Sequence, residues 1–345
     1  MVLCCACAIV PTSILDRFAA DEALSETTRA AFANASNHAK GWRGQRTSLS
    51  PAARHTKLKP ATTVRPLRPS VLVFDCRGSS TQPGDQIETP ESNNEEQARR
   101  IHHNMALLTS FYKSIFNRNS IDNNGMGLIN SIHYGQTYCN AYWTGTQMVF
   151  GDGDGEIFTD FALSDDVLAH EFAHGVTQYT TGFGFWDEPG ALNESASDVF
   201  ASVFRQWRFR QSADRADWTI GASILGPTAR ERGFRSLRNL SHPDSPDCLS
   251  TQPLHMRDYD KSGDPHVNSG IPNYAFYLAA NAIGGNTWDR IALVWYSALA
   301  NGRRQPNMLF EEFAALTVNK AASLFRTNAT VPRAIERGWK DVGVI

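Results

Sequence analysis

The pattern that most constrains this chain is His170-Glu171-Phe172-Ala173-His174, followed further along by Glu194. On a helix, residues four positions apart share one face, with Cβ atoms about 5–6 Å apart, so both imidazoles can bind one ion. Glu194, on a second helix, is a candidate third ligand. Two histidines and one glutamate leave the fourth position of a tetrahedral zinc ion open for chemistry. The pattern therefore predicts two packed helices with one zinc site between them.

Two neighbouring acids extend this site. Glu171 follows the first ligand and can point to the open coordination position, as a general base must. Asp198 stands one turn after Glu194, where it can accept the second ring N–H of a ligand histidine. By itself the pentapeptide also fits two surface histidines flanking a glutamate, and Asp198 alone fits a charge on a helix surface. Their combination favours the metal site.

The periodicity of apolar residues divides the chain into three parts. We expect a helix over 13–35, then strands at 71–74, 132–134, 141–143 and 148–150, with a helix at 98–116 between them. Beyond Asp165 the pattern is almost wholly helical, with candidates at 166–181, 190–207, 271–283, 287–300, 309–325 and 331–340. These elements predict an α+β chain: a pro-segment and basic linker (1–69), a β-rich lobe (70–165) and a mainly helical lobe (166–345), with the chemistry near the join.

Charge and composition exclude several classes of protein. A net charge of -2 over 345 residues gives no field that would attract nucleic acid or an anionic membrane. No apolar run approaches the roughly 18 residues that span a bilayer. Residues 1–10 are apolar but no basic residue precedes them, so we interpret them as part of a folded pro-segment rather than a degenerate Sec-type signal.

The stretch 36–70 is basic and rich in proline. It holds eight Lys or Arg and no Asp or Glu. This composition favours a solvated linker over an anion-binding arm, and such a linker is where a protease can cut to release the pro-segment.

Longer motifs carry a resemblance to a family. The stretch HEFAHGVTQYTTGFGFWDEPGALNESASD (170–198) resembles the zinc-binding core of thermolysin-like neutral metalloproteases, and the likeness continues in 140–155, 253–259 and 266–280. The N-terminal CAIVPTSILDRFA is similar to the short pro-segment of the protealysin-like branch. The resemblance implies a two-lobed zinc endopeptidase made as a zymogen and inhibited by its own pro-segment. It also implies one catalytic zinc ion, protein or peptide substrates, no nucleic-acid partner and a monomeric state.

The same resemblance implies a mechanism and a substrate preference. Zinc-activated water would attack the peptide bond with Glu171 as general base, while His266, in HVNSGIPN, would donate a hydrogen bond to the developing oxyanion. Asn140 and the Ala141 backbone would hold an extended substrate, and Arg238 would bind a substrate carbonyl. An apolar pocket for the side chain after the cleaved bond implies cleavage on the amino side of bulky hydrophobic residues. Its residues, which fit core packing equally well, are Phe158, Phe161, Val167, Ile220 and Leu237.

The chain departs from the family pattern at the oxyanion site. Phe185 stands where the family usually has a tyrosine whose hydroxyl stabilises the oxyanion. This supports an alternative, a catalytically weakened zinc-binding homologue that acts by protein binding or inhibition, although Glu171 and His266 argue against it. A zinc aminopeptidase would need an acidic anchor for the substrate amine, and no motif provides one. The carboxylate that orients His266 is either Asp260 or Asp264.

The double calcium site of the family is expected to be absent. Asp166 and Asp217 remain, but Arg205, Thr219 and Ala222 replace the usual acidic ligands, and a cation there opposes calcium binding. A guanidinium at position 205 would replace part of the calcium charge.

Two further expectations concern the N-terminal region. A thiolate from Cys4, Cys5 or Cys7 is a candidate for the open zinc position, although steric blocking by a docked pro-segment needs no thiolate. The family resemblance favours export, while the missing Sec-type signal leaves a cytoplasmic location open.

Overall fold

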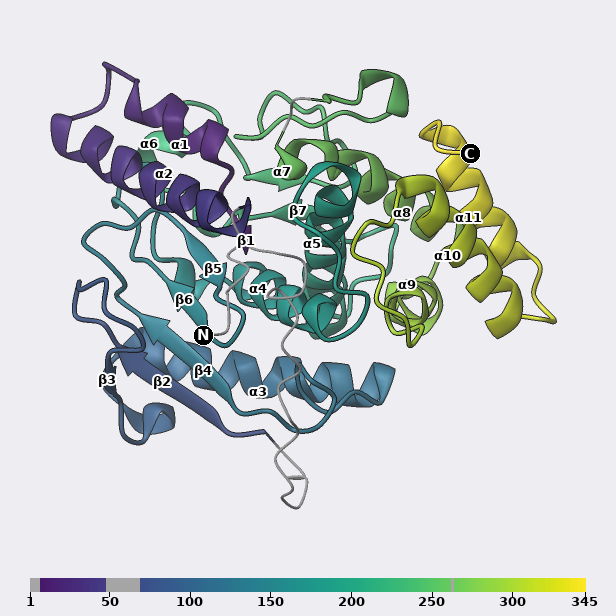
Figure 1. The fold of residues 1–345 in the computed structure, drawn as a ribbon, viewed down its shortest axis with the longest axis horizontal. Helices are drawn as coiled ribbons and strands as arrows, with labels where there is room; N and C mark the ends of the chain where they lie inside the picture. The colour runs from purple at the N-terminus through teal and green to yellow at the C-terminus, as the bar shows by residue number, and fades with distance from the viewer. Residues whose placement is uncertain (1–6, 48–68, 262–263) are drawn as a thin grey trace.

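The computed structural model describes residues 7–47, 69–261 and 264–345. Figure 1 shows the purple N-terminal helices lying over one side of the β-rich lobe, with the yellow C-terminal helices at the opposite end of the molecule. The expected α+β architecture of pro-segment, β-rich lobe and helical lobe is confirmed.

A mixed sheet forms the centre of the first lobe. Its strand order is β1-β5-β6-β4-β2-β3, in which β2, β4 and β6 run parallel and the other pairs are antiparallel. Helix α3 (Glu96–Phe116) packs its buried face, including Ile101, Met105 and Leu108, beside the sheet. The strands are β1 (Cys7–Ala8), β2 (Val71–Asp75), β3 (Asp85–Gln86), β4 (Leu128–Ile132), β5 (Ala141–Trp143) and β6 (Met148–Phe150).

A strand was expected at 132–134, but the observed strand β4 ends at Ile132. Strand β4 stops at Ile132 because His133 has a φ of 51°, in the left-handed region that an extended strand cannot use. The apolar residues at 132 and 134 are both buried, but they belong to a strand end and a loop. The expectation was therefore wrong by several residues.

The helix expected at 13–35 is two helices. Helix α1 (Thr12–Ala19) ends before Asp21, and α2 (Glu26–Thr47) begins after Ser25, whose hydroxyl accepts a hydrogen bond from the Thr28 N–H at 3.0 Å. This is the cap that starts a new helix. Helix α2 also runs through 36–47, which the basic composition had assigned to the linker. The remaining linker, 48–68, lies outside the described residues.

The second lobe is almost wholly helical, as expected. Its two-stranded sheet pairs Ile220 with Arg238. The expected helix at 287–300 begins as a 3-10 turn, Thr287–Asp289. The elements are α4 (Asp165–Gln178), α5 (Asp187–Phe209), β7 (Thr219–Ile220), α6 (Pro227–Glu231), β8 (Arg238–Asn239), α7 (Pro265–Asn268), α8 (Gly270–Ile283), α9 (Ile291–Leu299), α10 (Phe310–Leu324) and α11 (Thr330–Asp341).

Helices α4 and α5 form the join between the lobes. Helix α4 follows Ser164 and carries two acids in its first turn, which suit the positive end of a helix dipole. Residues 166–177 are all buried. At Gly175 an added Cβ would lie 2.9 Å from the Ile121 side chain, so this turn of α4 has no room for a larger residue.

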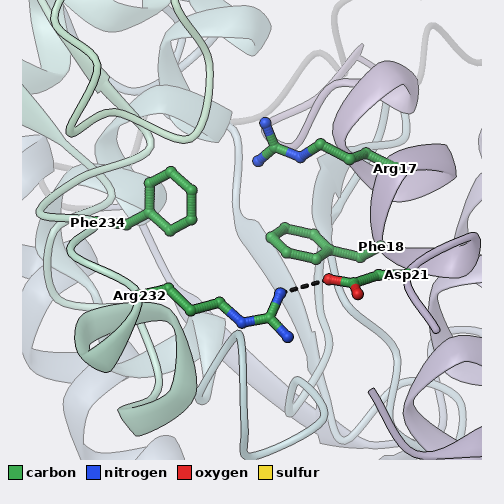
Figure 2. Close-up of a pocket in the computed structure, with 5 residues that line it drawn as sticks. All are labelled: Arg17, Phe18, Asp21, Arg232 and Phe234. Atoms are coloured by element: carbon green, nitrogen blue, oxygen red, sulfur yellow. Dashed lines mark hydrogen bonds and ion pairs between the residues drawn. The ribbon is translucent and has the colours of Figure 1, made fainter. Parts of the chain in front are cut away.

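The pro-segment is fixed to the catalytic lobe at two places away from the metal ligands. In the first, Asp21 forms an ion pair with Arg232, and the Arg17 guanidinium lies 4.9 Å from the ring centre of Phe18 and 5.6 Å from that of Phe234 (Figure 2). The five residues line a pocket between α1 and the loop after α6.

The second attachment is a cluster of rings around His38 of α2. Its Nε2 lies 3.1 Å from the Tyr134 hydroxyl and its Nδ1 lies 3.0 Å from the Tyr138 hydroxyl. The ring of Tyr142 is 5.4 Å away between centres. Burial lowers the pKa of His38, which favours the neutral imidazole in this cluster.

Two general findings complete the fold. Within the described residues, no helix is both long and apolar enough to cross a membrane. Cys76, Cys139 and Cys248 are buried and form no disulfide. Cys4 and Cys5 lie outside the described residues, as does the side chain of Cys7, so the thiolate hypothesis stays untested.

Candidate metal centre

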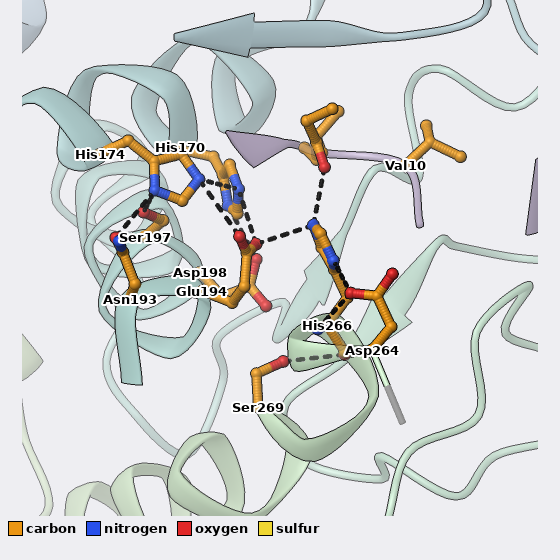
Figure 3. Close-up of polar contacts among 12 residues, drawn as sticks. Val10, His170, His174, Asn193, Glu194, Ser197, Asp198, Asp264, His266 and Ser269 are labelled. Atoms are coloured by element: carbon orange, nitrogen blue, oxygen red, sulfur yellow. Dashed lines mark hydrogen bonds and ion pairs between the residues drawn. The ribbon is translucent and has the colours of Figure 1, made fainter. Parts of the chain in front are cut away.

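Three side chains from α4 and α5 converge where the two helices meet. The Nε2 atoms of His170 and His174 are 3.0 Å apart, and Glu194 oxygens lie 3.5 and 3.8 Å from them, respectively (Figure 3). One ligand atom from each residue lies within 4.8 Å of the others, and all three residues are buried. The structure thus brings together the three ligands predicted from the sequence.

The second nitrogen of each histidine faces an oxygen. His170 Nδ1 lies 2.9 Å from Asp198 Oδ1, and His174 Nδ1 lies 3.0 Å from the Asn193 side-chain oxygen. With the protons on Nδ1, both Nε2 lone pairs point into the centre. Asp198 thus takes the position proposed for it, against His170.

These residues fit a zinc ion. Two imidazole lone pairs at 3.0 Å repel each other and the nearby Glu194 carboxylate unless a cation lies between them. Glu194 Oε2 is buried and has no hydrogen-bond donor of suitable geometry within the described part of the chain. Nitrogen and oxygen donors in a His, His, Glu set are what a catalytic zinc site uses.

Glu171 is buried beside the ligands with both carboxylate oxygens unpaired. Neither oxygen has a hydrogen-bond partner within the described residues. Burial raises the pKa of its carboxyl to about 8, although the positive field of His170 opposes this shift. An unpaired buried carboxylate is costly, so it needs a partner that enters the site.

His266, from the short helix α7, approaches the centre from the opposite side. Its Nε2 lies 3.1 Å from Glu194 Oε2, and its Nδ1 lies 2.5 Å from Asp264 Oδ1. The other candidate for orienting this ring, Asp260, instead uses its backbone to bond Asn268 at both N–H and C=O. Of the two acids, the structure brings Asp264 to His266.

Arg238 and Asp198 form a buried pair under the ligands. Arg238 donates from Nε and Nη2 to the two Asp198 oxygens at 3.0 and 2.8 Å. Asn273 donates to Asp198 as well, at 3.0 Å. Burial opposes ionisation of Asp198, but Arg238 and His170 hold its pKa well below the usual range. Asp198 therefore stays ionised and holds both Arg238 and His170 in place.

The residues predicted to line the substrate pocket lie around the β7–β8 pair and the start of α4. Phe158 and Phe161 have ring centres 5.5 Å apart, and Leu237 donates its N–H to the Ile220 carbonyl at 2.9 Å. Val167 follows Asp166, which accepts a hydrogen bond from Gly221 in the turn after β7. All five side chains are fully buried.

The N-terminal segment lies against the residues that were predicted to bind substrate. Asn140 exchanges hydrogen bonds with the Val10 backbone, and Ala141 accepts one from the Ile9 N–H. Figure 3 shows Val10 on the purple segment that follows β1, on the same side of the centre as His266. The predicted substrate-binding residues are therefore brought together, and the pro-segment lies across them.

Arg205 lies beside the two acids that remain of the calcium pattern. Its Nη2 is 2.9 Å from Asp217 Oδ2, and its Nη1 is 3.5 Å from Asp166 Oδ2. The Thr219 carbonyl accepts a further hydrogen bond at 3.0 Å. Phe185 lies half-buried in the loop between α4 and α5.

Sequence reasoning missed several residues that shape the site. Asn193, which fixes the His174 ring, directly precedes a predicted ligand, and that adjacency was a usable signal. Asn273 donates a hydrogen bond to Asp198, and Thr12 donates one to Asp264. Each lies far in sequence from the acid it binds, so no local pattern indicated it.

Two family profiles match this chain. The thermolysin metallopeptidase catalytic domain matches residues 39–178, and the thermolysin metallopeptidase alpha-helical domain matches residues 181–344.

Individual proteins are similar over most of their length. An extracellular metalloprotease of Pectobacterium carotovorum subsp. carotovorum is 40% identical over 283 residues, which cover 79% of this chain and 80% of the relative. Protease PrtS of Photorhabdus sp. (strain Az29) is 39% identical over 282 residues, 79% of this chain and 76% of the relative. The precursor of protealysin, a metalloproteinase from Serratia proteamaculans, matches with a TM-score of 0.84 and 35% identity, covering 99% of this chain and 100% of that chain.

Proposed function

Because the chain belongs to the thermolysin family of metallopeptidases, as a zinc-dependent endopeptidase in precursor form, we propose a role for each residue around its metal centre. His170, His174 and Glu194 hold the zinc ion. When bound, zinc supplies a Lewis acid that activates water and polarises the scissile carbonyl. Glu171 takes the proton of the attacking water and passes it to the leaving amine. The unpaired, buried Glu171 carboxylate beside three converging ligands is the observation that carries this proposal.

His266 stabilises the charge that develops on the carbonyl oxygen. Its Nε2 already reaches a peptide carbonyl of the pro-segment at 2.7 Å, and Asp264 fixes the ring from the other side. A donor held in place before the reaction costs no reorganisation when the oxyanion forms.

The substrate lies extended along β5 with a bulky apolar side chain after the cleaved bond. The Asn140 side chain and the Ala141 backbone form hydrogen bonds with the substrate backbone. Arg238 binds the carbonyl of the residue that follows the cleaved bond. The five pocket side chains are apolar and fully buried, which supports a preference for Leu, Ile, Val or Phe. Peptides that differ only at this position test the preference, and equal turnover of Leu and Asp peptides would exclude it.

Casein hydrolysis by the matured protein, next to Glu171→Ala with zinc quantified in both, tests the proposed function. We expect about one zinc ion in each, with casein cleavage lower in the variant by about 10²–10⁴-fold, the usual contribution of a general base. Equal cleavage by both proteins would refute the role of Glu171.

Phe185 supports a second candidate, a weakened homologue that acts by binding. Phenylalanine cannot donate a hydrogen bond to an oxyanion, and one lost donor costs about 10²–10³ in turnover. If the matured parent binds zinc and cleaves no casein, while Phe185→Tyr restores cleavage, the weakened homologue is the better description.

We also propose that Arg205 replaces the double calcium site. Its guanidinium lies between the two retained acids, Asp166 and Asp217, and supplies positive charge where calcium would. We propose export as well, because a relative that is 40% identical is named an extracellular metalloprotease. Detection of the protein in culture medium by immunoblot tests it.

A further inference from the structure

Strand β1 of the pro-segment forms the edge of the sheet at the proposed substrate site. Cys7 pairs with Trp143 and Ala8 pairs with Tyr142, antiparallel to β5. An extended peptide that adds to a sheet edge is how many peptide-binding sites hold their ligands. The question is which of its peptide bonds lies at the metal centre.

The peptide unit between Ala8 and Ile9 is held at both ends. The Ala8 carbonyl oxygen lies 2.7 Å from His266 Nε2, and the Ile9 N–H donates to the Ala141 carbonyl at 3.1 Å. One partner thus polarises the carbonyl and the other fixes the amine of the same bond. These are the two atoms whose positions hydrolysis must control.

The following peptide unit, between Ile9 and Val10, is held by Arg238 and Asn140. The Ile9 carbonyl accepts a hydrogen bond from Arg238 at 2.8 Å, and the Val10 N–H donates to the Asn140 side chain at 2.9 Å. Asn140 also donates to the Val10 carbonyl, at 3.1 Å. Two successive units therefore fill the proposed positions in order, and the chain runs in one direction through the site.

The position of the metal ligands selects the first unit. His266 Nε2, which holds the Ala8 carbonyl, is also 3.1 Å from Glu194 Oε2. Strand β1 also packs against helix α4, which carries His170, His174 and Glu171. The Ala8 carbonyl therefore shares its partner, His266 Nε2, with the ligand Glu194, whereas the Ile9 carbonyl is held by Arg238.

The side chain after this bond also suits the proposed preference. Ile9 is bulky, apolar and fully buried, and its own carbonyl is held by Arg238, which is paired with Ile220 of the pocket. The pro-segment therefore presents an apolar residue where the proposed function requires one.

We propose that Ala8–Ile9 is an intramolecular cleavage site, hydrolysed by the chain's own metal centre. This inference rests on the proposed function. Water adds across the bond: the carbon–nitrogen bond breaks, the water oxygen ends in a new carboxylate on Ala8, and the leaving nitrogen becomes the free amine of Ile9. No oxidant or further reactant is needed.

Cleavage at this bond removes the residues up to Ala8 but does not release the pro-segment. Ile9 and Val10 keep their contacts with Arg238 and Asn140, and the ion pair of Asp21 with Arg232 is unaffected. The linker still joins Ile9 onward to the catalytic lobe. The cut precursor should therefore remain latent toward casein until the linker is cut as well.

The test follows the mass and N-terminal sequence of the full chain over time. Four proteins are purified: the parent, Glu171→Ala, Ile9→Asp, and Ile9→Leu as the matched apolar control. With zinc, the parent and Ile9→Leu should lose residues 1–8 completely, at a rate independent of protein concentration. Glu171→Ala, Ile9→Asp and the chelated parent should keep them.

A second measurement needs no turnover. In the Glu171→Ala protein, hydrogen exchange of the Ile9 and Val10 amides should be slow, because both donate to partners in the cleft. Adding Asn140→Ala should accelerate exchange at Val10 and leave the amides of α11 unchanged. Fast exchange at both residues before the second substitution would overturn the proposed register.

The outcomes separate this inference from the proposed function. If matured protein cleaves casein while zinc-loaded precursor keeps residues 1–8, the inference is wrong and the function stands. If neither casein nor the Ala8–Ile9 bond is cleaved, the proposed function itself fails. A cleavage rate that rises with protein concentration overturns the intramolecular step.

Discussion

Arg238 joins the support of the metal ligands to the N-terminal segment. It is completely buried, donates twice to Asp198 and once to the Ile9 carbonyl, and thereby links the metal ligands to the segment in the cleft. Since Asp198 also faces His170, the guanidinium controls ligand geometry without touching the metal.

Replacing this guanidinium should cost considerable stability. Arg238→Ala leaves the Asp198 charge buried and uncompensated, so the free energy of unfolding should fall by about 3–5 kcal/mol. Urea unfolding of the full chain measures it. Arg215→Ala is the matched control, because Arg215 is 85% exposed and lies 3.9 Å from Asp214; its effect should be below about 1 kcal/mol. Similar losses in the two variants would contradict the argument.

His133 gives the fold a pH dependence away from the metal ligands. Its Nδ1 lies 2.9 Å from Asp152, and this hydrogen bond raises the pKa of His133 to about 9. A raised folded-state pKa adds stability that is fully present below the ordinary value of 6.5 and is lost as the pH rises through about 9. With allowance for solvent screening, we expect a loss of about 1 kcal/mol across that interval.

The variant His133→Asn isolates this contribution. Asparagine tolerates the left-handed backbone at this position, so the loop should keep its shape. The difference in unfolding free energy between parent and variant, measured by urea titration, should shrink from pH 6 to pH 9.5. Exposed His103 on α3, changed to Asn, should give no such trend. A pH-independent difference for His133→Asn would contradict the prediction.

Residue types and local spacing were enough to predict the ligands and the support from Asp198, but not the other supports. His170 and His174 are one helical turn apart, so their shared face follows from the helix alone. The choice between Asp260 and Asp264 depends on how the short helix α7 begins. Asp264 caps it and accepts from the His266 N–H at 3.1 Å, a geometry that a single sequence does not reveal.

At the scale of elements, helix boundaries were harder to predict than helix existence. The region 13–35 has the right apolar spacing for one helix, but Ser25 caps a second helix in its middle. Basic composition then favoured a linker over 36–47, because composition does not record that His38 of α2 docks against three tyrosines. A local cap determined the outcome in the first case, and tertiary contacts far along the chain determined it in the second.

Helix α5 carries the residue proposed to replace calcium, and its side chain can be exchanged for a calcium ligand. We expect the melting temperature of the parent to be the same with calcium and with a chelator. Arg205→Glu places a third carboxylate beside Asp166 and Asp217, so without calcium the protein should lose about 2 kcal/mol through like-charge repulsion. Calcium should restore part of this loss, since it binds clustered oxygen ligands.

Arg205→Met is the matched control for this experiment. It removes the same positive charge at similar length but supplies no carboxylate, so calcium should restore nothing. Scanning calorimetry of the three proteins, each with and without calcium, compares them directly. A parent whose melting temperature rises with calcium would refute the proposed replacement.

At the scale of the whole molecule, we expect the latency of the precursor to depend on the pro-segment and the proposed substrate site being parts of one polypeptide. While 48–68 joins them, a short tether keeps the pro-segment at an effective concentration on the order of millimolar beside the cleft. Dilution cannot weaken an intramolecular contact. Once the tether is cut, the same contacts must hold two separate chains together, and dilution then favours release.

A recognition sequence for a site-specific protease, inserted within 48–68, makes this testable. Before the cut, specific activity on casein should be near zero at every dilution. Immediately after the cut, and while the mass spectrum still shows the pro-segment undigested from Ile9 onward, specific activity should rise as the protein is diluted. Asp21→Ala, which loses the ion pair with Arg232, should reach half activation at a higher protein concentration, whereas exposed Glu22→Ala should match the parent. Since only a bimolecular inhibitor responds to dilution, a cut protein with activity independent of concentration would mean that the tether contributes nothing to latency.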